Sequence, residues 1–138
     1  FVPFHMLTRE FYQTAKRRMK PGGVLAQNIE PTTMLFDAAI ATLASVFEHV
    51  ELYPASGNVV AVAYDGPHKD ADGLAKRARA LQEAHDFYYP LPDLLSSRRI
   101  LTTVPGSDPL VDDFAPVEML KSIERHNAGV DTISQPAQ

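Results

Sequence analysis

The sequence predicts an α/β protein, because helical patterns alternate along the chain with short apolar runs typical of strands. Helical spacing occurs over residues 7–19 and again over 32–47, and strand-like runs occupy 24–26, 49–53 and 59–64. The run at 24–26 has no polar alternation, which is typical of a strand covered on both faces in a parallel sheet. The expected order is therefore helix, strand, helix, strand, turn, strand.

The first predicted helix begins near Leu7 and ends near Met19. Its apolar stripe recurs every four positions and consists of Leu7, Phe11, Ala15 and Met19. Thr8 is placed to cap the start of this helix. The Pro-Gly-Gly sequence that follows cannot continue a helix and is expected to end it.

A second helix is expected after Pro31, with Thr32 or Thr33 as its cap. Its buried side is formed by Leu35, Ala39, Leu43 and Val46 or Phe47. A cluster of turn-forming residues at 54–58 then separates two strand-like runs. Because the connection is so short, these two strands should pair antiparallel.

The remainder of the chain predicts a third helix at 71–85, an irregular aromatic arm at 87–95, and a short helix at 116–125. We expect three parts: an α/β unit at 1–66, a helical and irregular extension at 67–125, and a flexible tail at 126–138.

The composition limits the class of protein. A chain of 138 residues is long enough for one domain with its own core, and the absence of cysteine excludes disulfides and thiolate nucleophiles. A formal net charge of -4 argues against nucleic-acid binding, and no apolar run approaches the roughly 20 residues that cross a bilayer. We expect a cytoplasmic protein with no membrane contact from this segment. Because no initiator methionine precedes Phe1, we also expect a piece of a longer protein.

The double glycine at 22–23 raises the question of a phosphate-binding loop. Such loops follow a strand and open a helix, whereas these glycines follow a predicted helix and precede a strand. We therefore interpret them as a helix stop. Gln27 and Asn28 are more informative, because ligands of open α/β sheets gather beyond the carboxyl ends of strands. The alternative is that both amides merely satisfy loop backbone groups.

Other polar groups are interpreted as structural. The five histidines lack the spacing of a metal site, so no metal ligand is predicted. Asp112, Asp113 and Glu118 could bind a cation such as an amine. In the interpretation we prefer, Asp113 caps a turn and Glu118 begins a helix. The pair Arg98-Arg99 is interpreted as solvated.

The N-terminal segment FVPFHMLTREFYQTAKRRMKPGGVLAQNIEP resembles the second half of the catalytic domain of spermidine synthase-like aminopropyltransferases. The family's motif positions are occupied by Pro3, Leu7, Phe11-Tyr12, Met19, Pro21-Gly22-Gly23 and Gln27. The segment FDAAIATLASVFEHVELYPASGNVVAVAY looks like the helix and final antiparallel strand pair of the S-adenosylmethionine-dependent methyltransferase fold. DDFAPVE is similar to a tail common in bacterial members. The resemblance covers roughly residues 1–66 and 108–120.

This resemblance implies the C-terminal portion of a Rossmann-like methyltransferase fold, and the transfer of an aminopropyl group from decarboxylated S-adenosylmethionine to putrescine. It places the glycine-rich loop, the ribose-binding acid and the catalytic aspartate in family segments before Phe1, so no catalytic or cofactor-binding residue is assigned here. The substrate-binding positions carried over are Gln27, a polar residue near the amine, and Pro3, on the loop after the aspartate. Asn28 stands where the family often has glycine.

We expect the isolated chain to be inactive and to bind no cofactor by itself, with a polyamine as the substrate and a homo-oligomer as the assembly of the parent protein. Two alternatives stay open. The chain is a fragment of another S-adenosylmethionine-dependent methyltransferase, or a non-catalytic homologue that acts as a binding module.

Overall fold

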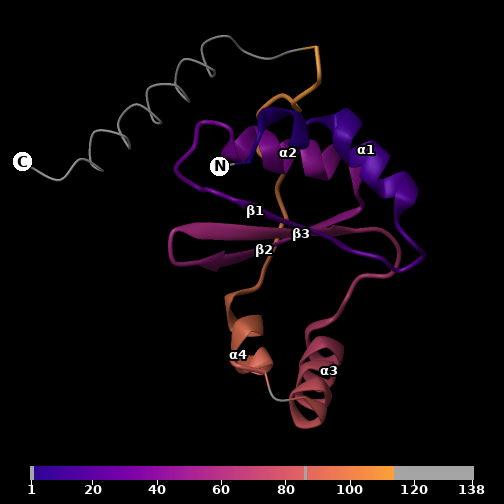
Figure 1. The fold of residues 1–138 in the computed structure, drawn as a ribbon, viewed down its shortest axis with the longest axis vertical. Coiled ribbons are helices and arrows are strands. Elements are labelled where there is room, and N and C mark those ends of the chain that lie inside the picture. The colour runs from indigo at the N-terminus through magenta and orange to yellow at the C-terminus, as the bar shows by residue number, and fades with distance from the viewer. Residues whose placement is uncertain (1, 86, 114–138) are drawn as a thin grey trace, which may run out of the picture.

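A computed structural model of the protein describes residues 2–85 and 87–113, and its centre is a single β-sheet. The strands are β1 (Leu25–Ile29), β2 (His49–Ala55), β3 (Asn58–Tyr64) and β4 (Arg99–Ile100), in the order β1-β3-β2-β4. Helices α1 (Arg9–Arg18) and α2 (Phe36–Val46) cover one face of the sheet, and α3 (Ala71–Ala84) and α4 (Leu91–Leu94) lie beyond the other (Figure 1). The predicted α/β class is confirmed.

Strand pairing is antiparallel at each of the three contacts within the described part of the sheet. The predicted antiparallel pair is confirmed as β2 and β3, whose turn contains Gly57 at φ +78°. The parallel pairing suggested by the run at 24–26 is not found among these residues. β1 pairs antiparallel with β3, Val24 precedes the strand, and Ala26 is exposed. The reason is that only one face of β1 is covered: burial alternates along the strand, and Ala26 and Asn28 are exposed on the other face.

The first predicted helix is confirmed as α1. Thr8 caps it by accepting a hydrogen bond from the Phe11 N–H, and the buried side chain of Tyr12 anchors the helix to the core. The predicted helix stop is confirmed as well, because Gly22 adopts φ +74° and the Gly23 N–H donates to the Lys20 carbonyl at 2.9 Å. A side chain at Gly22 would be strained by that backbone conformation.

The second predicted helix is confirmed as α2, but its predicted cap is wrong. Leu35 occupies the cap position without a side-chain hydrogen bond, and the Thr33 hydroxyl donates instead to the Glu30 carbonyl at 3.0 Å. Residues 38–43 of α2 are buried between α1 and the sheet. The Thr42 hydroxyl accepts from the Leu110 N–H at 2.8 Å, so the chain beyond β4 returns to this side of the sheet.

The third predicted helix is confirmed as α3, which Asp70 caps by accepting from the Gly73 N–H at 2.7 Å. The arm predicted at 87–95 is not wholly irregular, because α4 lies within it and is followed by the 3-10 turn η2 (Leu95–Ser97). Tyr88 is 90% exposed and Tyr89 64% exposed, so these aromatic rings do not pack against the described core. The helix predicted at 116–125 and the tail at 126–138 fall outside the described residues, and the three-part division of the chain stays a prediction.

Candidate functional site

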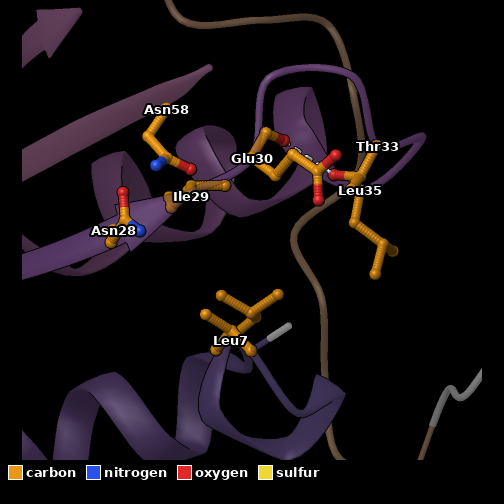
Figure 2. Close-up of a pocket in the computed structure, with 8 residues that line it drawn as sticks. Leu7, Asn28, Ile29, Glu30, Thr33, Leu35 and Asn58 are labelled. Carbon is orange, nitrogen blue, oxygen red and sulfur yellow. Dashed lines mark hydrogen bonds between the residues drawn. The ribbon is translucent and has the colours of Figure 1, made fainter. Parts of the chain in front are cut away.

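A small pocket lies at the carboxyl end of β1 (Figure 2). We call it the β1-end pocket, and its volume is about 90 Å³. Its lining residues are Val2, Leu7, Asn28, Ile29, Glu30, Thr33, Leu35 and Asn58. It therefore combines an apolar base with a polar rim at the edge of the sheet.

Local backbone structure places the polar rim. Ile29 pairs with Val59, so Asn28 on β1 and Asn58 at the start of β3 lie on neighbouring strands. Glu30 follows β1 directly and is held in a turn, in which its carboxylate accepts from the Thr32 hydroxyl at 2.7 Å. The 3-10 turn η1 (Phe4–Met6) closes the opposite side, since Val2 and Leu7 flank it.

The chemistry of this rim suits a cation. Glu30 is the one charged residue among those that line the pocket, and Asn28 and Asn58 add amide oxygens that accept hydrogen bonds. A volume of about 90 Å³ is well below the roughly 300–1,000 Å³ of complete small-molecule sites. The β1-end pocket can therefore hold one polar group of a ligand, such as an ammonium, but not a whole nucleoside.

The two predicted substrate-binding residues meet at η1 rather than in the pocket. The Gln27 side-chain amide donates to the Met6 carbonyl at 3.4 Å, and the Pro3 carbonyl accepts from the Met6 N–H at 2.9 Å. Gln27 lies within β1 rather than beyond it, and its side chain is on the face opposite to that of Asn28. The sequence neighbours of both residues, Val2 and Asn28, do line the pocket. A role for Gln27 and Pro3 in substrate binding stays a prediction.

The other candidate residues are dispersed. The Asp112 N–H donates to the Glu10 carboxylate at 3.1 Å, Asp113 is exposed, and Glu118 lies outside the described residues. A ring nitrogen of His49 lies 2.8 Å from the Gly66 carbonyl oxygen. Across 2–85 and 87–113, no group of three or more histidines and carboxylates is arranged to hold a metal ion.

Sequence reasoning missed a buried carboxylate on β2. Glu51 is 2% exposed and accepts hydrogen bonds from Tyr64 Oη at 2.7 Å, Tyr53 Oη at 3.0 Å and Arg98 Nε at 2.7 Å. Arg98 also donates from Nη2 to Glu51 Oε1 and, at 2.6 Å, to the Lys69 carbonyl. The interpretation of Arg98 as solvated is therefore wrong, because its guanidinium forms a buried ion pair. We call these four side chains the Glu51 cluster.

Burial alone would raise the pKa of Glu51, but the hydrogen bonds from Arg98, Tyr64 and Tyr53 and the charge of Arg98 lower the pKa from 4.5 to about 2. Burial and the hydrogen bond to Glu51 raise the pKa of Tyr53 to about 12 and also raise the pKa of Tyr64. Hydrogen bonds to Glu51 likewise raise the pKa of Arg98. Glu51 thus stays ionised and fully paired at neutral pH, which fits an anchor rather than an acid or base. The signal in the sequence was a charged residue in an apolar strand, but its partner lies 47 residues away.

The fold and pocket define an α/β protein with a small, cation-compatible recess at the edge of its sheet. Comparisons with known proteins indicate which proteins the chain is similar to. No protein-family model matches the chain. The chain is similar to a polyamine aminopropyltransferase of Vibrio vulnificus (strain CMCP6), with 29% identity over 129 residues that cover 88% of this chain. It spans 42% of the length of that relative. This likeness points to the aminopropyltransferase family. Within the described residues, no helix has the length and apolar character needed to span a membrane.

Proposed function

We propose that this chain is the C-terminal part of a spermidine synthase-like protein that transfers an aminopropyl group from decarboxylated S-adenosylmethionine to putrescine. The observation that carries the proposal is the polar rim of the β1-end pocket, in a chain similar to a polyamine aminopropyltransferase. The antiparallel pair of β2 and β3 stands where the resemblance places the final strand pair of a methyltransferase-like fold, and this supports the proposed architecture.

In this proposal, the β1-end pocket receives one amino group of the diamine. Putrescine carries two ammonium groups at neutral pH, and each loses hydration when it enters a recess. The Glu30 carboxylate offsets that loss by a charge-assisted hydrogen bond, and the amide oxygens of Asn28 and Asn58 accept hydrogen bonds from the remaining ammonium N–H groups. Gln27 and Pro3 shape the adjoining turn η1 and contribute polar groups on the substrate side.

The resemblance assigns the glycine-rich loop, the ribose-binding acid and the catalytic aspartate to other segments of the parent protein. We propose that the isolated chain holds the amine weakly and transfers no aminopropyl group, because deprotonation of the attacking amine and binding of the nucleoside depend on those segments. A cytoplasmic location and a homo-oligomeric parent protein complete the proposal, and both rest on the family.

Calorimetry with putrescine tests the pocket. We expect Glu30→Gln to weaken putrescine binding by about tenfold, the effect of losing one charge-assisted hydrogen bond. Glu83→Gln is the matched control, since Glu83 is an exposed carboxylate on α3 and does not line the pocket. Equal affinities in the two variants would contradict a role for Glu30.

Titration with 5'-methylthioadenosine tells an amine site from a nucleoside site. Binding of putrescine without 5'-methylthioadenosine supports the proposal, and binding of 5'-methylthioadenosine without putrescine contradicts it. An assay for spermidine formation completes the test, because detectable aminopropyl transfer by the 138-residue chain would overturn the proposal that it is inactive alone.

A further inference from the structure

An apolar cleft lies on the face of the sheet opposite α1 and α2, between the strands and the α3–α4 hairpin. We call it the α3 cleft, and its volume is about 570 Å³. Its lining residues are Tyr53, Pro54, Ala55, Val60, Val62, Leu74, Arg77, Ala78, Leu81, Leu91, Leu94, Leu95 and Ser97. This volume falls within the roughly 300–1,000 Å³ of small-molecule sites, and the lining is almost wholly aliphatic or aromatic.

A second cleft of about 580 Å³ adjoins the first, and the two share Leu74 and Arg77. It lies at the start of α3 and also contains Lys69 and Asp70. The Asp70 carboxylate already accepts the Gly73 N–H at 2.7 Å. Two cationic residues, Lys69 and Arg77, therefore line this cleft with one carboxylate, which is engaged with the helix backbone. The Lys69 Nζ lies 4.7 Å from the centre of the Tyr64 ring. The partial positive charge at the start of α3 adds to these cations.

The polar groups of the α3 cleft other than Arg77 are already satisfied. Tyr53 donates its hydroxyl proton to Glu51, and the Ser97 hydroxyl donates to the Leu94 carbonyl at 3.0 Å. Arg77 is an exposed residue, and it makes no ion pair or side-chain hydrogen bond with any residue in the part of the chain that the structure describes. The cleft is thus amphipathic, with an apolar body and one uncommitted cation where the two clefts join.

We propose that the α3 cleft binds an amphiphilic carboxylate, whose apolar chain lies between the sheet and the α3–α4 hairpin and whose anionic head meets Arg77. The apolar walls supply affinity by removing hydrocarbon from water, and Arg77 selects an anion over a neutral head group. This site is distinct from the β1-end pocket, since the two share no lining residue. It does not depend on the proposed aminopropyl transfer.

The test uses decanoate and its neutral counterpart decanol, each titrated by calorimetry below its aggregation concentration. We expect saturable binding of decanoate, a loss of about tenfold in Arg77→Gln, and no change in decanol binding in that variant. Arg79→Gln is the matched control, because Arg79 is an exposed cation on the same helix and lines neither cleft. Ala78→Phe should abolish binding of both probes by filling the cleft, and Leu81→Gln offers a milder change at a position that is 37% exposed.

Several outcomes would overturn the proposal. Absence of saturable decanoate binding by the unaltered protein is one, and an equal loss in Arg77→Gln and Arg79→Gln is another. Light scattering provides the third. If the protein self-associates, Leu81→Gln removes that self-association, and decanoate does not bind, then a second copy of the chain occupies the cleft. Far-UV circular dichroism of every variant separates loss of binding from loss of folding. If putrescine does not bind, or if Glu30→Gln does not weaken its binding, the interpretation of the decanoate titrations is unchanged.

Discussion

Replacement of Glu51 by glutamine should destabilise the protein more than any comparable change on its surface. The substitution keeps the size of the side chain but leaves the Arg98 guanidinium, whose side chain is 9% exposed, without a counter-charge. It also directs an amide N–H₂ toward donors that need an acceptor. Breaking one side of a buried ion pair typically costs about 3–5 kcal/mol. We expect a loss of that size in the free energy of unfolding near neutral pH.

The pH dependence gives a second, independent magnitude. Folding lowers the pKa of Glu51 from 4.5 to about 2. The ionised carboxylate therefore stabilises the folded protein in full above the unfolded-state pKa, and this stability is lost as the pH falls through the folded-state pKa. At about 1.4 kcal/mol per unit, this contribution is about 3 kcal/mol near neutrality, and about 2 kcal/mol of it is gone by about pH 3. Glutamine does not titrate. The difference in unfolding free energy between the unaltered protein and Glu51→Gln should therefore be about 2 kcal/mol smaller at about pH 3 than near neutrality.

Urea unfolding at about pH 7 and about pH 3 measures both effects. Glu48→Gln is the control, because Glu48 is exposed and, among the described residues, its carboxylate accepts a hydrogen bond only from the Gly66 N–H. Its replacement should therefore cost at most about 1 kcal/mol of unfolding free energy. The double variant Glu51→Gln/Arg98→Met should recover part of the stability, since it removes the unpaired charge. The reasoning would be refuted if Glu51→Gln were as stable as Glu48→Gln. It would also be refuted if the difference in unfolding free energy between the unaltered protein and Glu51→Gln did not change with pH.

Three further changes test the packing. Tyr12→Phe should leave the unfolding midpoint unchanged or raise it slightly in a urea titration, because the buried Tyr12 hydroxyl has no hydrogen-bond partner in the described structure. Thr42→Val should lower the free energy of unfolding by about 1–3 kcal/mol in the same assay, because the buried Leu110 N–H loses its acceptor. An unchanged midpoint would show that the segment around Leu110 moves away when the hydroxyl is removed. Light scattering should show self-association through the edge of β1, and Ala26→Lys should reduce it, because an unpaired strand edge seeks a partner; a clean monomer would count against an open edge.

Local patterns in the sequence predicted most of the elements but not their long-range partners. Thr8 identified the start of α1, the glycines at 22–23 its end, and the turn at 54–58 the antiparallel pair, because each signal acts on its own neighbours. The cap of α2 was mispredicted because Thr33 bonds backward to Glu30, which periodicity cannot reveal.

The sequence pointed to the carboxyl end of the first strand as a place for ligands, and the β1-end pocket lies there. The strand itself ends three residues further along the chain than the apolar run at 24–26 suggested. Gln27 therefore faces η1, while Asn28 and Glu30 line the pocket. Asn58 joins them only through the register of β1 with β3, and Arg98 reaches Glu51 across 47 residues. Such contacts depend on tertiary packing, so no local pattern encodes them.

The Glu51 cluster connects to one proposed site and not to the other. Tyr53 donates to Glu51 and also lines the α3 cleft, and Arg98 joins β2 to the backbone just before α3. Removal of the Glu51 charge should therefore loosen the floor and one wall of the α3 cleft and weaken decanoate binding. The β1-end pocket is built from Asn28, Glu30 and η1, which make no hydrogen bond to the cluster, so putrescine binding should persist wherever the protein stays folded. Comparison of the two ligands in Glu51→Gln thus distinguishes a local anchor of the extension from a residue that merely sustains the whole fold.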